Sequence, residues 1–165
     1  MPAMFKVGDL VVYPTHGIGV IKSIESKNLL EGEKRSFYIV QLLENNMVIM
    51  IPTDNVQSVG LRPLISKEEI PKVFCVLKEG KRLSLNGGSY NKRHKELMDK
   101  LKTGCIYDTA EVLRDLALLR EEKTLSFSEK KLLNTARKLL VQEISIVHQS
   151  PEEVVDTQIR EILNL

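Results

Sequence analysis

The sequence contains no tryptophan, only two cysteines and no long apolar run. A helix that crosses a bilayer needs about 20 consecutive apolar residues, so the sequence predicts no membrane segment. Cys75 and Cys105 lie far apart and neither belongs to a Cys-x-x-Cys pair, which argues against a zinc site and against a disulfide framework. We therefore expect two buried, reduced thiols. Met1 to Met4 lack the basic head and apolar stretch of a secretory signal, which predicts a cytoplasmic protein.

Residue types that carry catalysis or bind metals are scattered. His16, His94 and His148 lie far apart, with no glutamate partner at metal-site spacing. Gly17-Ile18-Gly19 resembles the start of a dinucleotide fingerprint, but no third glycine or helix follows, and a turn between strands explains it better. The chain also lacks a Walker-type phosphate loop and a nucleophile elbow. The sequence thus predicts no catalytic residue, no metal and no cofactor, and it favours a protein that is not an enzyme.

Charge is nearly balanced over the whole chain but unevenly distributed. There are 24 basic and 22 acidic residues in all. Up to Ile65, six basic residues accompany six acidic ones, whereas residues 78–102 hold eight basic and three acidic residues. Such a local cationic surplus points to nucleic acid rather than to a membrane, because no lipid anchor or apolar helical face accompanies it. A solvated helix face is the alternative, and the sequence leaves both open.

The first 65 residues have the pattern of a small β domain. Runs rich in β-branched and aromatic residues, separated by turn residues, predict strands at 10–13, 19–24, 36–42, 47–51 and 56–60. Five short strands are too few for a sandwich and fit a small SH3- or Tudor-like β-barrel. The predicted fold class is therefore α+β, with this barrel at residues 1–65 and a helical domain at residues 66–165.

Residues 66–165 show helical spacing and repeated helix-start signals. The signals are possible capping boxes at Ser66–Glu69 and Ser126–Glu129, an Asp108 cap, and Ser150 followed by Pro151. In a capping box the serine and the glutamate each satisfy a backbone N–H that has no partner within the helix. Glycines at positions 80, 87, 88 and 104 mark the interruptions. These signals predict five helices that pack as a compact bundle.

Tyr90 follows a polar, glycine-containing loop and precedes a basic helix expected at 91–102. It stands beside Lys92 and Arg93. One interpretation is an aromatic presented to a nucleic-acid groove next to cations that contact phosphates. The other is a residue that packs at the helix N-terminus. Two further aromatics beside helix starts, Tyr107 and Phe127, are expected to be packing or core residues.

Several short motifs occur in a particular order along almost the whole chain. They are Phe5-Lys6-Val7-Gly8-Asp9, Val11-Val12-Tyr13-Pro14, His16-Gly17-Ile18-Gly19, Val59-Gly60-Leu61-Arg62, Asn91-Lys92-Arg93-His94-Lys95, Glu111-Val112-Leu113-Arg114 and Ser128-Glu129-Lys130. No single motif is diagnostic, but their order and spacing resemble the CarD/CdnL family of bacterial transcription factors.

The resemblance implies a function and two sets of contact residues. In that family a Tudor-like domain binds the β subunit of bacterial RNA polymerase, and the helical domain contacts promoter DNA at the upstream edge of the melted bubble without reading sequence. The implied polymerase contacts are Lys27, Val48, Ile49 and Met50. The implied DNA contacts are Tyr90, Asn91, Lys92, Arg93 and Lys95. The resemblance further implies a monomer that is associated with the nucleoid through the polymerase and that stabilises the open promoter complex.

The chain departs from the family pattern at the aromatic wedge. The family usually carries a tryptophan that inserts into the minor groove, and this chain has none. Tyr90 falls at or beside the wedge position and offers a smaller stacking face.

Two other functions remain open. The chain could be a plain adaptor that binds one protein through each domain and does not contact DNA. It could also be a Tudor-type reader, with Tyr13, Phe37 and Tyr38 forming an aromatic cage for a methylated lysine, although core packing is the commoner role of such residues.

Overall fold

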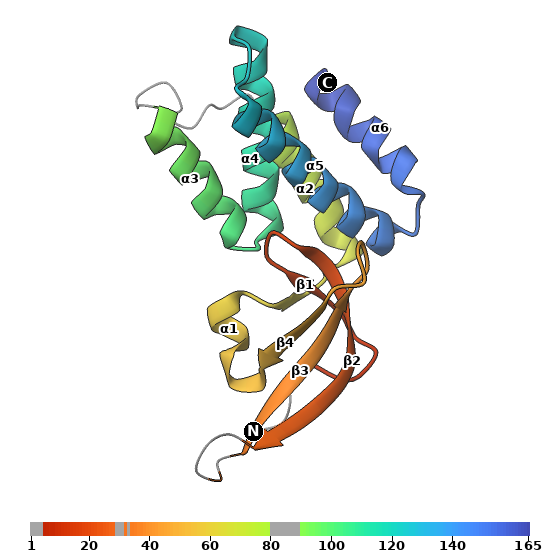
Figure 1. Ribbon diagram of the computed structural model, residues 1–165. Helices are drawn as coiled ribbons and strands as arrows, with labels where there is room; N and C mark the ends of the chain where they lie inside the picture. Colours follow the sequence, from red (N-terminus) through yellow and green to blue (C-terminus); the bar gives the residue numbers. More distant parts are fainter. Residues whose placement is uncertain (1–4, 29–31, 33, 80–89) are drawn as a thin grey trace. The chain divides into compact units, whose positions relative to one another are not determined.

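The computed structural model describes residues 5–28, 32, 34–79 and 90–165. The chain divides into two compact units, Met1–Leu64 and Ile65–Leu165. The described residues form one five-stranded antiparallel sheet and six α-helices (Figure 1). The mixed α+β class predicted from the sequence is therefore confirmed. The first unit, hereafter the sheet unit, holds all the strands, and the second, the helical unit, holds five of the described helices.

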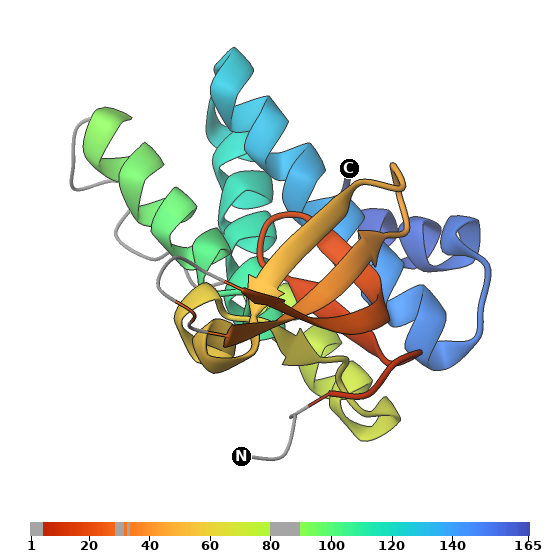
Figure 2. The same ribbon diagram turned by 60° about the horizontal axis from the view of Figure 1, so that its bottom comes forward.

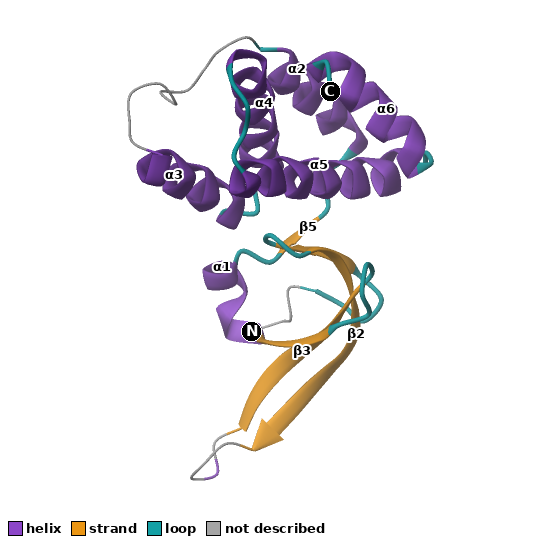
Figure 3. Cartoon of the chain, turned by 45° about the horizontal axis from the view of Figure 1, so that its top comes forward, coloured by secondary structure: helices purple, strands orange, loops and turns teal. Residues whose placement is uncertain are grey.

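The sheet is a curved set of short strands. Its members are β1 (Leu10–Tyr13), β2 (Gly17–Asn28), β3 (Lys34–Leu42), β4 (Val48–Pro52) and β5 (Arg62–Pro63). They pair in the order β4-β3-β2-β1-β5. Figure 3 shows how strongly the long β2–β3 hairpin bends. Among the described residues, β4 and β5 form the two edges of the sheet, so the ladder does not close into a barrel there.

The segment expected to be the fifth strand is helical. Val56–Val59 forms the short helix α1, which follows a 3₁₀ turn at Thr53–Asn55. Gly60 ends α1 in the left-handed conformation, with φ of 77°, a conformation that glycine adopts without steric cost. A run of four residues is too short for its apolar spacing to distinguish a strand from a helix. Val56 is buried in the core of the sheet unit.

The sheet unit has a small core of apolar and aromatic side chains. Its buried members are Phe5, Val11, Ile21, Tyr38, Val40, Ile51, Val56 and Leu61. Tyr38 is fully buried, its ring meets that of Phe5 edge to face at 5.7 Å, and its hydroxyl accepts the Phe5 backbone N–H at 3.1 Å. A buried hydroxyl needs such a partner, so this hydrogen bond fixes the start of the described chain against the core.

Gly19 explains the Gly17-Ile18-Gly19 motif. It lies opposite Leu42 in the β2–β3 pair. A Cβ atom at Gly19 would lie 2.6 Å from Cγ1 of Val40 and 3.1 Å from the carbonyl oxygen of Gln41. The glycine thus permits a close approach of two strands, and the motif has no part in binding a dinucleotide.

The helical unit packs its helices around an extended apolar core. The helices are α2 (Ile70–Lys78), α3 (Tyr90–Lys102), α4 (Ile106–Glu122), α5 (Phe127–His148) and α6 (Glu152–Leu163). α4 and α5, the two longest, lie side by side (Figure 2). Among the described residues, none of the helices is long and apolar enough to cross a membrane.

Two of the predicted helix starts are confirmed. At α5 the Glu129 N–H donates to Ser126 Oγ at 3.2 Å and the Ser126 N–H donates to Glu129 Oε1 at 3.1 Å, the reciprocal pair of a capping box. Before α2 the Ser66 N–H donates to Glu69 Oε2 at 2.9 Å, and a 3₁₀ turn at Lys67–Glu69 leads into the helix.

The other two helix starts lie elsewhere than predicted. α4 begins at Ile106, so Asp108 lies within its first turn and accepts a hydrogen bond from Thr103 Oγ1 at 2.7 Å instead of acting as the cap. Pro151 directly precedes α6, and Ser150 is not its cap. In both places the sequence signal is correct to within a turn, because acidic residues and proline favour the whole first turn of a helix.

The two cysteines are free, as expected, but they are not fully buried, contrary to the expectation from the sequence. Cys75 is exposed and Cys105 is partly buried. Cys75 lies on α2 between Phe74 and Val76, and the buried face of that helix consists of Ile70, Val73 and Leu77. The i, i+3, i+7 spacing of the buried residues leaves position 75 on the solvent side.

A buried cluster of charges joins α4 to the end of α2. Arg114 and Asp115 are 2% and 1% exposed. Arg114 Nε donates to Asp115 Oδ1 at 3.0 Å, and Nη1 donates to Glu79 Oε2 at 3.0 Å and to the Val76 carbonyl at 3.4 Å. Burial raises the pKa of Asp115, although the hydrogen bond and charge of Arg114 act in the opposite direction. The Arg114 guanidinium therefore offsets part of the cost of burying the Asp115 carboxyl.

Candidate nucleic-acid interface and exposed sheet edge

α3 separates its basic residues between two faces. Arg93, Leu97 and Leu101 are buried at four-residue spacing and pack into the helical unit. Asn91, Lys92 and Lys95 are exposed. The amphipathic pattern of the helix therefore decides which of its cations reach solvent.

Arg93 does not belong to the exposed set. It is 8% exposed, and its Nε and Nη2 atoms lie 3.0 Å and 2.9 Å from Glu129 Oε2. The Arg93 guanidinium is therefore paired with the Glu129 carboxylate, whose side chain is itself only 2% exposed. Arg93 was expected to contact phosphates, but its buried guanidinium instead joins the start of α3 to Glu129 at the start of α5.

Glu129 is the shared partner of this junction. One carboxylate oxygen accepts from Arg93 and the other accepts the backbone N–H of Ser126. Burial alone would raise the pKa of Glu129, but the Ser126 N–H and the Arg93 charge outweigh it and hold the pKa below its ordinary value. The carboxylate is therefore ionised at neutral pH and keeps both helix starts in place.

Tyr90 is partly held at the same junction. It is the first residue of α3 and is 40% exposed. Ser126 Oγ donates to the Tyr90 hydroxyl at 3.2 Å, which lowers the pKa of Tyr90. Its ring stacks on His94 at 5.9 Å, and the Arg93 guanidinium carbon lies 5.6 Å from the ring centre. These contacts support the packing interpretation of Tyr90. The loop at residues 81–89, which includes the remainder of the motif, lies outside the described residues.

Phe127 is the exposed aromatic that the sequence did not predict. It is 83% exposed, so the expectation that it packs into the core is wrong. The position of the capping box could have predicted this exposure. Phe127 is the first residue of α5, directly after the cap Ser126, whereas the apolar residue that packs against a capped helix is the one before the cap. That residue is Leu125, which is 5% exposed.

The junction thus carries a surface of mixed chemistry, which we call the helix-start surface. It consists of Tyr90, Asn91, Lys92, Lys95 and Phe127. Tyr90 and Phe127 belong to neighbouring helix starts, because Ser126 Oγ, next to Phe127 in the chain, donates to the Tyr90 hydroxyl. Ammonium groups can neutralise phosphates, and an exposed ring can stack on an unpaired base. Exposed ammonium groups and an exposed ring are the side-chain chemistry that a nucleic-acid interface requires.

The sheet unit offers a different kind of surface at its β4 edge. β4 pairs with β3 through Gln41–Val48, Val40–Ile49 and Ile39–Met50. Val48 and Met50 are 58% and 43% exposed, and Ile49 is partly buried. Lys27 is exposed opposite Arg35 in the β2–β3 pair, outside the part of β3 that meets β4. An apolar edge strand can accept a further strand from a partner.

The geometry argues against an aromatic cage. Tyr38 is fully buried and its hydroxyl is engaged by the Phe5 backbone. Tyr13 and Phe37 are partly buried, and Tyr13 packs edge to face on His16. In the described ranges, no group of three or more histidine, cysteine or acidic side chains could hold a metal ion.

Comparison with known proteins agrees with the resemblance noted in the sequence. The model of the CarD-like/TRCF RID domain matches residues 5–65 and that of the CarD C-terminal domain matches residues 72–160. The "Putative transcription factor YdeB" of Bacillus subtilis (strain 168) is 37% identical over 152 residues, which cover 92% of this chain and 97% of that protein. The solved structure "CdnLNt from Myxoccoccus xanthus" is 48% identical, covers 41% of this chain and 93% of its own, and has a TM-score of 0.33. The chain therefore belongs to the CarD/CdnL family of transcription factors.

Proposed function

We propose that this transcription regulator binds the β subunit of bacterial RNA polymerase through its sheet unit and stabilises the open promoter complex through its helical unit. The observation that carries the proposal is the helix-start surface, where two exposed lysines accompany an exposed phenylalanine. The family to which the chain belongs supports the polymerase as the partner. DNA contacts of this kind are independent of sequence, because phosphates and base faces are common to all sequences.

The polymerase contact is proposed at the β4 edge. Its outer side presents backbone groups that no described strand pairs with, together with the Val48 and Met50 side chains. A strand of the β subunit added to this edge would gain main-chain hydrogen bonds and cover the exposed apolar side chains. Lys27 would then lie near the far end of the same sheet and meet an acidic group of the partner.

The DNA contact is proposed at the helix-start surface. Lys92 and Lys95 contact phosphates, Asn91 adds a neutral hydrogen-bonding group, and Phe127 stacks at the edge of the melted region, with Tyr90 beside it. Stacking costs least where melting has already separated the bases. The chain would then bind the open state better than the closed state, and it shifts the equilibrium by no more than this difference in affinity. Tethering to the polymerase raises the local concentration of the helical unit.

The polymerase contact is tested by capture of purified β subunit on the immobilised full chain. We expect Val48→Lys with Met50→Lys to abolish capture, because a charged edge resists strand addition. Val7→Lys is the matched control, since Val7 is an apolar side chain of the same unit and is 61% exposed. If the wild-type chain fails to retain the β subunit, or if the double variant retains it fully, the assignment is wrong.

The DNA contact is tested by the salt dependence of binding to a fork-junction duplex. Replacing Lys92 and Lys95 by glutamine should reduce the slope of log K against log salt by about 0.9 for each lost contact. Lys67→Gln with Lys72→Gln removes two exposed lysines from elsewhere in the same unit and should leave the slope nearly unchanged. An unchanged slope in the Lys92 and Lys95 variant, with β-subunit binding intact, would favour a plain adaptor.

A further inference from the structure

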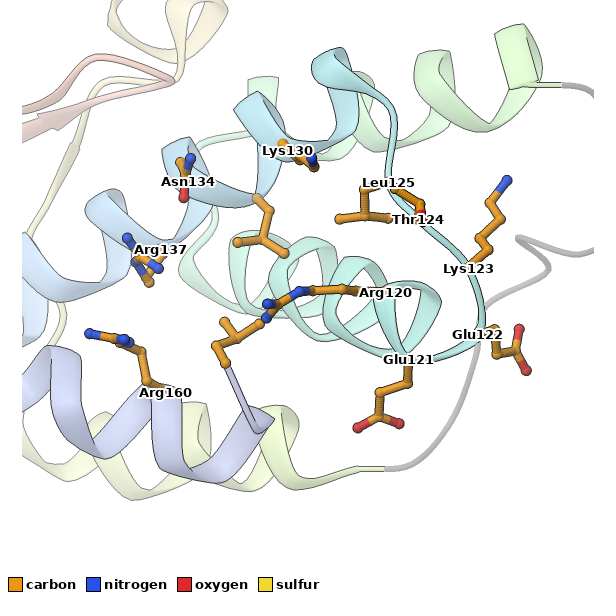
Figure 4. Close-up of a pocket in the computed structure, with 12 residues that line it drawn as sticks. Arg120, Glu121, Glu122, Lys123, Thr124, Leu125, Lys130, Asn134, Arg137 and Arg160 are labelled. Carbon is orange, nitrogen blue, oxygen red and sulfur yellow. The ribbon is translucent and has the colours of Figure 1, made fainter.

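A second cationic feature lies in the helical unit, in a hollow at the end of α4. The hollow has a volume of about 660 Å³ and is lined by Arg120 and the residues that follow it, by one face of α5, and by Arg160 and Leu165 at the end of α6 (Figure 4). The α5 residues are Lys130, Leu133, Asn134 and Arg137, which share a face at i, i+3, i+4 and i+7 spacing. None of these residues belongs to the helix-start surface.

The charge of this hollow is predominantly positive. Five cations line it: Arg120, Lys123, Lys130, Arg137 and Arg160. Two acidic residues also line it, Glu121 and Glu122, but Figure 4 shows their carboxylates directed away from the hollow, whereas the Arg120 side chain extends into it. Cations therefore outnumber the acidic residues that line the hollow, and at least Arg120 extends into it.

Asp156 neutralises only part of this charge. It lies 3.3 Å from Arg137 Nε and 3.7 Å from Arg160 Nη1, so one carboxylate serves two guanidiniums. Each guanidinium has five N–H donors in a planar fork, and most of these remain available. In the described part of the chain, no ion pair joins an acidic side chain to Arg120, Lys123 or Lys130.

The fold accounts for only some of these cations. Arg120 and Arg160 lie in the last turns of α4 and α6, where a positive charge complements the helix dipole. Lys130 lies near the start of α5, where the dipole disfavours a cation, and Arg137 lies in the middle of that helix. The helix dipole explains neither α5 cation. Arg137 is paired with Asp156 of α6, but the fold supplies no such partner for Lys130 among the ion pairs of the described residues. An anionic ligand would satisfy cations from all three helices.

The shape of the hollow identifies the size of that ligand. Volumes of about 300 to 1,000 Å³ are typical of sites for small organic molecules, and the volume of the hollow lies within that range. Leu125, Leu133 and Leu165 supply an apolar part of the lining, while arginines bind phosphate oxygens in pairs. We propose that the hollow binds a small organic polyphosphate of the nucleoside di- or triphosphate class, with Arg120, Arg137 and Arg160 on its phosphates. This site is independent of the proposed contacts with polymerase and DNA.

The test is calorimetric titration of the full chain with GTP and with sodium tripolyphosphate at moderate salt. We expect saturable binding of GTP, and a loss of at least tenfold in affinity when Arg120 and Arg160 are both replaced by glutamine. These two are chosen because both are exposed and Arg137 is left to bind Asp156. Lys138→Gln removes an exposed cation next to Arg137 that does not line the hollow and should change the affinity less than twofold.

Three outcomes would overturn the proposal. The first is that neither probe binds at millimolar concentration. The second is that replacing both Arg120 and Arg160 by glutamine leaves GTP binding unchanged. The third is that the same double variant loses fork-junction DNA binding while GTP does not bind the wild type. The last result would make the hollow part of the DNA-binding surface. Comparing the two probes separates recognition of the phosphates from recognition of the nucleoside, because tripolyphosphate carries only the former. Melting curves of each variant establish that a loss of binding is not a loss of folding.

Discussion

The two units of this chain stabilise their interiors by different means. The sheet unit buries apolar and aromatic side chains with a single phenol hydroxyl among them. Every buried charged side chain of the described residues belongs to the helical unit: Arg93, Arg114, Asp115, Glu129 and Glu143. Four of these contact a group of another helix or its cap, or are paired with a residue that does, and Glu143 accepts the backbone N–H of Ile65, just before the start of the helical segment. In the helical unit, charge therefore contributes to structure as well as to surface.

The comparison shows why a count of basic residues overstates a binding surface. Residues 78–102 hold a surplus of cations. However, Arg93 forms an ion pair with Glu129, and Lys100 forms one with Glu111, with its Nζ atom 2.7 Å from Oε2. The cations of α3 that belong to the helix-start surface, Lys92 and Lys95, are both exposed. The sheet unit, which is neutral overall, presents its most distinctive surface as an apolar edge. The two surfaces therefore differ in kind: one is an apolar strand edge and the other carries exposed lysines.

The largest expected effect breaks the buried charge cluster of the helical unit. Arg114→Met leaves Asp115 buried without its guanidinium, which should cost about 3 to 5 kcal/mol of unfolding free energy. Urea unfolding followed by circular dichroism measures it, and exposed Lys138→Met is the control. Adding Asp115→Leu should recover much of the loss, since a buried pair can be replaced by apolar residues at little cost. A double variant that is no more stable than Arg114→Met would contradict this account.

A smaller effect is expected at the junction of α3 and α5. Glu129→Gln should cost about 1.5 to 3 kcal/mol at neutral pH, the range for hydrogen bonds to a charged group. The pKa of Glu129 is lowered by folding, so its contribution is complete above the unfolded pKa of about 4.3 and is lost as pH falls through the folded value. Unfolding free energies measured from pH 7 to pH 3 should show the wild type and the variant converging. A gap that stays constant with pH would refute the role of the ionised carboxylate.

A comparable or smaller effect is expected in the sheet unit, where shape rather than charge is decisive. Gly19→Ala places a Cβ atom 2.6 Å from Val40 Cγ1, and such overpacking costs about 1 to 3 kcal/mol. Thermal unfolding measures the change, with exposed Lys22→Ala on the same strand as control. Because the substitution involves no charge, the loss of unfolding free energy should be the same across roughly pH 5 to 8, where carboxylates stay ionised. A pH-dependent loss would undermine the contrast between the two units.

The smallest effect on stability is expected at the exposed aromatic. Phe127→Ala should change the unfolding free energy by less than about 0.5 kcal/mol, as for surface substitutions, yet shorten the lifetime of open promoter complexes. Tyr90→Phe keeps the ring and removes the hydroxyl that meets Ser126, so it should affect the lifetime less. Equal lifetimes for Phe127→Ala and the wild type would exclude Phe127 as the stacking residue, whereas a large loss of stability would show that it packs after all.

The local features of the fold were largely predictable from sequence. Strand positions from β1 to β4, the capping box at Ser126–Glu129 and the run of helices after residue 65 follow from neighbouring residues. The α1 segment was not predictable, since four residues carry too little periodicity. The exposure of the candidate residues was predicted only in part: Lys92 and Lys95 lie on the exposed face of α3, whereas Phe127, expected to pack, is exposed and Arg93, expected to contact phosphates, is buried.

The sequence by itself determined the division into a β part and a helical part, the main helix starts and the family, because these depend on patterns of nearby residues and on motif order. Only the tertiary structure decided which cations and aromatics face solvent. Arg93 and Glu129 are 36 residues apart, as are Tyr90 and Ser126, so nothing local reveals either contact. Burial is a property of a residue together with its distant partners, and those partners meet only when the helices pack.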